Sequence, residues 1–341
     1  MSMMPVDWPT AARLAGRLTP AGPPVSREEA RLLVADLRAA AVRARGLAVR
    51  ASGRAGALDA VGRAALSADV RVVDRPGWAR AAAASFAGLV GSTRGSALTT
   101  GTTGQVGAVL ALLAGKVLGQ FDPYADDVGP GGRLVVVAPN VLRTERALRV
   151  DATDFRLWVC AHEQTHALQF AAAPWLADHV RAETTALLED VTSTTPVEEL
   201  SAVLTGVLRL LRGTSKEWSL LDALPSGQRE RVERLGAVMS LLEGHADVTM
   251  DAVGPRDIAS VRTLRARLDS RRAHARGADR VLRRLLGLDA KLAQYRNGAA
   301  FVRAVRAQDP TALDAAWVGP DGLPRPAEIA EPERWLRRVH G

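Results

Sequence analysis

From residue 153 almost to its end, the sequence is a succession of segments in which apolar residues recur at the spacing of a helix. The candidate helices are residues 153–172, 175–191, 197–213, 227–252, 256–272, 277–296 and 298–307. Aromatic residues make up only 4% of the chain, so its core must be built mostly from Ala, Leu and Val. Because Ala and Leu favour helices over strands, we expect a mainly α protein.

Before residue 153 the pattern is mixed, and it predicts a small β-sheet. Residues 70–73 alternate as strands do, and residues 133–138 form the most strand-like apolar run in the sequence. Ser26 and Glu29 have the spacing of a capping box, which predicts a helix from there to about Ser52.

Two more helices are expected at residues 78–90 and 105–119, the first of them after a break at Arg75-Pro76-Gly77. Residues 91–104, between these helices, are rich in Gly, Ser and Thr, and we interpret them as a loop. This segment lacks the Gly-Lys-Ser/Thr ending of a P-loop and follows no strand, which argues against a phosphate site.

With 341 residues, the chain can form one large domain or two ordinary ones. We divide it into an N-terminal part (1–69), a central domain (70–309) and a Pro-rich C-terminal arm (310–341), expected to form one compact unit. Residues 1–25 are rich in Pro and Gly, so the N-terminal part should begin with an irregular lead-in. We expect the C-terminal arm to be irregular for the same reason.

The charge pattern, the single cysteine and the apolar segments indicate the cellular compartment and the classes of binding partner that we expect. The net charge is +8, but the arginines are interleaved with Asp and Glu and no nucleic-acid-binding motif is present. Cys160 is the only cysteine, so no internal disulfide can form, and we expect it as a small buried hydrophobic side chain. Residues 1–24 do not have the pattern of a signal peptide, and the most apolar run, 106–115, is too short to cross a bilayer. We therefore expect a cytoplasmic protein that binds neither nucleic acid nor membranes.

The run His162-Glu163-Gln164-Thr165-His166 is the motif that carries chemistry. Two histidines four residues apart lie on one face of a helix, one turn apart, and can bind a single metal ion. Zinc lowers the pKa of a bound water towards about 7, so Glu163 could act as a general base and activate that water. The apolar residues around the motif favour a well-packed helix, which a metal site needs.

Two histidines leave a catalytic zinc one protein ligand short. We regard Glu243 as the best candidate, with His179, Glu183 and Glu189 as alternatives. Asp247 lies four residues after Glu243, on the same helix face, and could orient a ligand histidine through its second ring nitrogen. Between them, His245 could donate a hydrogen bond in the transition state if Gly244 distorts the helix.

The residues Trp158–His166, followed by Gln169-Phe170 and Pro174-Trp175-Leu176, resemble the type 2 zincin-like metallopeptidases. Further segments with the same resemblance bring the similarity to about residues 70–300; they are residues 73–78, 105–123, 134–140 and 243–247. Some members of this family are associated with the biosynthesis of a deazaflavin cofactor. The resemblance implies a zincin-like helical domain with a small β-sheet, with Zn²⁺ on the two histidines and Glu163 as general base.

These observations predict a zinc-dependent hydrolase, and a metallopeptidase first. The metal, with His245 or an arginine, would stabilise the oxyanion. The strand at residues 133–138 could line the cleft and pair with an extended substrate. The same residues could serve a hydrolase of a non-peptide amide metabolite, or a catalytically silent zinc-binding module. The substrate would be a peptide or a small amide, and the sequence does not indicate the oligomeric state.

Overall fold

The computed structural model describes residues 6–53, 69–90, 97–124, 127, 129, 131–194, 226–273 and 298–341. The chain divides into two compact units. One, which we call the sheet unit, comprises Met3–Ala172 and Thr249–His274; the other, the helical unit, comprises Met1–Ser2, Ala173–Val248 and Ala275–Gly341. The helices predicted at residues 197–213 and 277–296 lie outside the described residues.

Within these described residues, the sheet has three strands in the order β1-β3-β2. They are β1 (Asp69–Val73), β2 (Gly119–Asp122) and β3 (Arg133–Val137). The two predicted strands are confirmed as β1 and β3, which run parallel, whereas β2 is antiparallel to β3 and was not predicted. Since β3 is hydrogen-bonded to a strand on each side, it cannot pair with a substrate, and that expectation was wrong.

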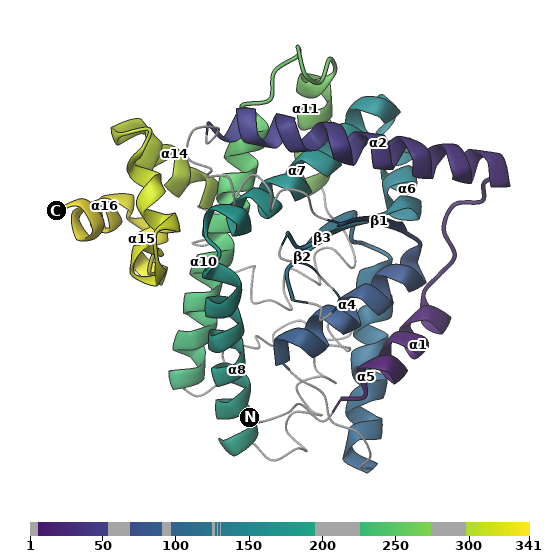
Figure 1. The fold of residues 1–341 in the computed structure, drawn as a ribbon, viewed down its shortest axis with the longest axis horizontal. Coiled ribbons are helices and arrows are strands. Elements are labelled where there is room, and N and C mark those ends of the chain that lie inside the picture. The colour runs from purple at the N-terminus through teal and green to yellow at the C-terminus, as the bar shows by residue number, and fades with distance from the viewer. Residues whose placement is uncertain are drawn as a thin grey trace. The chain divides into compact units, whose positions relative to one another are not determined.

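The helices of the sheet unit surround this sheet (Figure 1). They are α1 (Trp8–Leu18), α2 (Arg27–Ser52), α4 (Arg75–Val90), α5 (Ala97–Ala114), α6 (Ala138–Leu148), α7 (Ala152–Ala172) and α11 (Val261–Ala273). The predicted capping box of α2 is present, with reciprocal bonds between Ser26 and Glu29. The main core joins buried side chains of α2, β3, α6, α7 and α11, and α2 packs along α7.

Two expectations for the N-terminal third were wrong because tertiary packing outweighs local propensity. The lead-in contains α1, whose first turn is capped by Asp7 and whose alanines are buried. The segment expected as a loop contains the first turns of α5, where Thr103 is buried and accepts a hydrogen bond from the Asp7 backbone N–H. Gly107 allows α1 and α5 to lie close, since a Cβ there would be 3.0 Å from the Ala11 carbonyl oxygen. Helix α5 ends at Ala114 because the chain then enters β2.

Helix α4 begins at Arg75 and therefore includes the residues expected to form a break. The Asp74 side chain accepts a hydrogen bond from the Gly77 backbone N–H, and Pro76 lies in the first turn, where proline is tolerated. Arg75 is buried and donates to Asn140 and to the carbonyl oxygens of two residues near the N-terminus. This arginine joins α4, the start of α6 and the segment that precedes α2.

The helical unit contains α8 (Leu176–Thr194), α14 (Gly298–Gln308), the short helices η2 (Ala312–Trp317), η3 (Pro320–Gly322), α15 (Pro326–Ala330) and α16 (Pro332–His340), and most of α10 (Ser226–Asp251). The segment from residue 310, expected to be irregular, is therefore mostly helical. Its helices pack around Trp335, which is completely buried and donates to the Gly322 carbonyl oxygen. Arg338 adds a salt bridge to Glu328.

Helix α10 is regular through Gly244, so it does not show the distortion that was considered as a condition for a role of His245. The glycine instead allows close packing, since a Cβ there would lie 2.1 Å from the carbonyl carbon of Gly298 in α14. The fold is mainly α with a small mixed sheet, as predicted. No helix of the described segments is long and apolar enough to cross a membrane.

Candidate metal centre

Helix α7 carries the predicted metal motif and is anchored in the core of the sheet unit. Asp151 caps its first turn by accepting a hydrogen bond from the Asp154 backbone N–H. The buried face of the helix includes Leu157, Cys160, Ala161 and Leu168, which face the core. His162, Glu163 and His166 remain only partly buried. The helix therefore presents His162, Glu163 and His166 on its accessible side, as their sequence spacing predicts.

The two histidines are oriented by neighbours on the same helix. Their ring centroids lie 5.0 Å apart and the rings are nearly perpendicular. Trp158, one turn earlier, stacks on His162 with a centroid distance of 5.9 Å. Gln169 Oε1 lies 3.0 Å from His166 Nδ1. Because an amide oxygen can only accept, Nδ1 is the donor, and Nε2 retains the lone pair that a metal needs.

Glu163 lies against strand β2. A Cβ at Gly119 would be 2.6 Å from Glu163 Cγ and 3.0 Å from its Oε1. Residues two apart on a strand share a face, so Phe121 also faces α7, where its ring lies 5.4 Å from that of Phe170. Gln120 faces the other way and accepts a hydrogen bond from Trp78 of α4. The unpredicted strand thus lies against Glu163 of the predicted metal motif.

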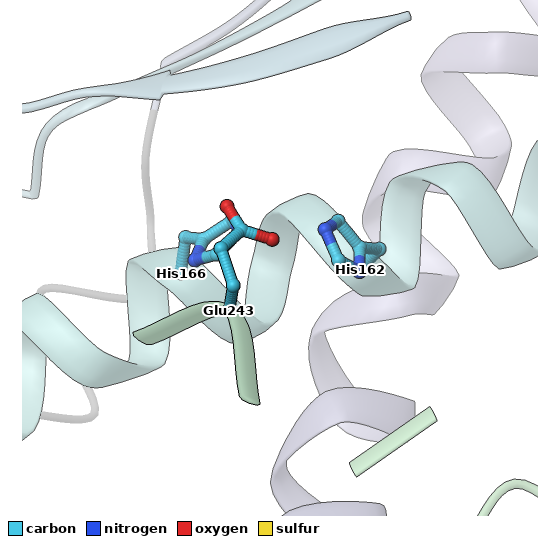
Figure 2. A group of neighbouring side chains, drawn as sticks. All are labelled: His162, His166 and Glu243. Atoms are coloured by element: carbon cyan, nitrogen blue, oxygen red, sulfur yellow. The ribbon is translucent and has the colours of Figure 1, made fainter. Parts of the chain in front are cut away.

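His162, His166 and Glu243 form the metal-ligand group found among the described residues. One donor atom from each residue lies within 4.8 Å of those of the other two, and Figure 2 shows the three side chains together. Two imidazoles and one carboxylate are a ligand set typical of catalytic zinc, with a fourth position left for water or substrate. The residues present therefore fit a zinc ion.

Two of the alternative third ligands, Glu183 and His179, have other contacts in the helical unit. Glu183 forms salt bridges with Arg231 (3.7 Å) and Arg234 (3.3 Å). His179 lies against the Trp175 ring, with a centroid distance of 5.9 Å. The Glu189 side chain is outside the described part of α8.

The remaining predicted residues lie on α10. His245 is completely buried, with its ring 5.2 Å from that of Trp317, so it contributes to the packing of the helical unit. A role for His245 in hydrolysis stays a prediction. Asp247 is half-buried, one turn after Glu243, and its predicted role in orienting a histidine also stays a prediction. The observed histidine partner is Gln169, which the sequence analysis missed although it lies at helical spacing from His166.

Cys160 is buried, as expected, and its thiol donates to the Leu37 carbonyl oxygen at 3.8 Å. Burial, with a smaller contribution from the negative charge of Glu163, raises the pKa of the Cys160 thiol to about 12. The thiol is therefore protonated at neutral pH and offers neither a nucleophile nor a metal ligand.

Comparison with known families agrees with this geometry. A model of the zincin-like metallopeptidases matches residues 6–336, almost the whole chain. The chain belongs to the zincin-like metallopeptidase family. Membership supports a hydrolase and implies a bound metal, for which the His-His-Glu group is suited.

A solved structure gives further support. The chain is similar to a protein from Chloroflexus aurantiacus whose crystal structure is described as that of a presumed hydrolase with a novel fold. The TM-score is 0.63 and the sequence identity is 29%, over 98% of each chain. No curated protein matches the sequence.

Proposed function

We propose that the protein is a zinc-dependent metallopeptidase in which His162, His166 and Glu243 hold the metal and Glu163 is the general base. The observation that supports this most strongly is the grouping of the three donor atoms within 4.8 Å, with Glu163 next to the first histidine on the same accessible helix face. The match to the family over nearly the full chain adds to it.

Each group has a role in hydrolysis that follows from its chemistry. When bound, zinc supplies a Lewis acid that polarises the scissile carbonyl and makes water more acidic. Glu163 takes a proton from the attacking water and delivers it to the leaving nitrogen. Gln169 keeps the proton of His166 on Nδ1, so that Nε2 would be available as the zinc ligand. The substrate would be a peptide or a small amide, since the same groups would hydrolyse either.

The first experiment measures metal content and hydrolysis together. The purified protein should contain about one zinc per chain, which elemental analysis measures. We expect Glu163→Gln to retain the zinc and to lower kcat by at least about 100-fold, because it removes the general base while keeping the shape of the side chain. Retained zinc with unchanged hydrolysis would show that Glu163 is not the base.

The third ligand is tested by a matched pair of substitutions. Glu243→Ala should lower zinc affinity, whereas Glu183→Ala, at one of the alternative ligand positions, should leave it unchanged although it breaks two salt bridges. A library of peptides and a library of small amides then distinguish the two substrate classes. Zinc binding without hydrolysis in either library would favour the catalytically silent module.

A further inference from the structure

Gly119 is the point at which strand β2 meets the Glu163 side chain. A Cβ built on Gly119 would lie 2.6 Å from Glu163 Cγ, 2.9 Å from its Cδ and 3.0 Å from its Oε1. Real Cβ atoms essentially never have a neighbour closer than 3.0 Å, so even alanine does not fit beside this side chain as it lies. The carboxylate thus occupies space that exists because residue 119 has no side chain.

The backbone at Gly119 does not itself require glycine. Its φ angle is outside the left-handed range, which in the described residues includes only two glycines, Gly53 and Gly132. Any residue could adopt the conformation of Gly119, and its register opposite Val136 in the sheet is that of an ordinary strand. What the glycine provides is therefore room rather than backbone freedom.

The packing of β2 against β3 and α7 fixes the space beside Gly119. Strand β2 is held against β3 by its ladder, and the Leu118 carbonyl oxygen accepts a further hydrogen bond from the Val137 backbone N–H. Phe121, the next residue of β2 on the same face, packs against Phe170 of α7, so the strand and the helix are joined on this side of Gly119. A glutamate has three rotatable side-chain bonds and would otherwise sample many positions.

We propose that Gly119 is a positioning residue for Glu163: its missing side chain allows the carboxylate to lie beside His162 and His166, between α7 and β2. This inference rests on the proposed function, in which Glu163 is the general base. Because Glu163 is flexible and partly exposed, an added methyl group should displace it towards solvent at little cost to the fold. Substitution of Gly119 by alanine should therefore lower kcat and leave zinc binding unchanged.

The test compares Gly119→Ala with Gly115→Ala, a nearby control where the closest atom to the new Cβ would be 3.6 Å away. We expect Gly119→Ala to retain wild-type zinc content, and a Tm within a few degrees of wild type. Its kcat should fall about 100-fold, the cost expected for a misplacement of about 1 Å, with little change in KM. Gly115→Ala should keep wild-type kcat.

A double variant shows whether the loss acts through Glu163. In the Glu163→Gln background the base is already absent, so adding Gly119→Ala should reduce the residual kcat/KM by less than about twofold. A further 100-fold loss would mean that the alanine disturbs the site in another way, and would overturn the proposal.

A crystal structure of Gly119→Ala separates this proposal from the proposed function. We expect the Glu163 carboxylate to be displaced while both histidines keep their positions. An undisplaced carboxylate would overturn the role of Gly119 whatever the activity. A wild-type protein that binds zinc and hydrolyses neither peptides nor amides would instead refute the proposed function, even if the carboxylate moves as expected. If Gly119→Ala does not fold, combining it with Glu163→Ala removes the three atoms that the new Cβ would meet and should restore folding. A double variant that also fails to fold would overturn the proposal.

Discussion

Replacing Gln169 by Leu should weaken zinc binding without unfolding the protein. The substitution keeps the approximate size of the side chain and removes the oxygen that lies 3.0 Å from His166 Nδ1. Groups that hold a ligand histidine in this way typically contribute 10–100-fold to metal affinity, which is about 1.4–2.7 kcal/mol. We expect a loss in this range, since one of the two histidines loses its orienting partner.

Helix α7 offers a matched control. Gln164 is also a buried glutamine, with an exposed fraction of 0% against 1% for Gln169, and it donates at 3.3 Å to the Ala41 carbonyl oxygen in α2. Gln164→Leu should therefore destabilise the fold about as much as Gln169→Leu but change zinc affinity less than about twofold. Gln169→Glu, which keeps an acceptor, should retain or raise the affinity.

Competition with a chromogenic chelator measures the affinity of each variant. The pH and the buffer must be the same throughout, because proton release accompanies metal binding. The reasoning is refuted if Gln169→Leu binds zinc as tightly as wild type. It is refuted equally if Gln164→Leu loses as much affinity, since the loss would then follow from disturbing α7 rather than from releasing His166.

Three further predictions concern the rest of the molecule. Gly244→Ala places a methyl group 2.1 Å from the backbone of α14 and should lower the free energy of unfolding by about 1–3 kcal/mol, as measured by urea titration. The control Gly227→Ala, in open space on the same helix, should raise the free energy of unfolding by up to about 1 kcal/mol. The buried Cys160 should resist thiol reagents at pH 8 and react once urea unfolds the chain; rapid labelling of the folded protein would contradict its burial. Burial raises the pKa of Glu328, but the hydrogen bonds from Arg338 and from the Arg325 backbone N–H, with the positive charges of both arginines, together outweigh it and lower the pKa below its ordinary value. The pair therefore stabilises the fold above the pKa of a free glutamate and stabilises it less as pH falls. Arg338→Met should consequently make Tm less dependent on pH between 7 and 4, and an unchanged slope would show that the pair does not contribute.

The part of the site that is local in sequence could be predicted, because helical geometry alone determines it. His162, Glu163 and His166 lie on one face of α7 as a consequence of the 3.6-residue period, and the apolar residues on either side of the motif indicated which face is buried. The capping box predicted the start of α2 for the same reason. Such patterns depend only on neighbours within one or two turns.

Features that depend on distant residues could not be obtained in this way. Strand β2 has four residues and no clear alternation, and it forms because β3 provides a partner. The role of Gly119 depends on a side chain that is remote in sequence, so nothing near it in the chain indicates which atom it accommodates. The C-terminal segment was expected to be irregular because it is rich in proline, whereas Pro326 and Pro332 each begin a helix, where the missing N–H of proline costs nothing.

The three-stranded sheet has two outer edges, and both are poorly suited to recruiting another copy of the chain. An exposed edge strand can template aggregation when it is long, flat and apolar. On one side β1 has five residues, and its exposed Asp69 and Arg71 form a salt bridge at 2.8 Å. On the other side β2 is only four residues long and ends at the buried Asp122, which accepts a hydrogen bond from Ser85. We therefore expect a concentrated solution of the folded protein to resist aggregation by pairing of its edge strands β1 and β2.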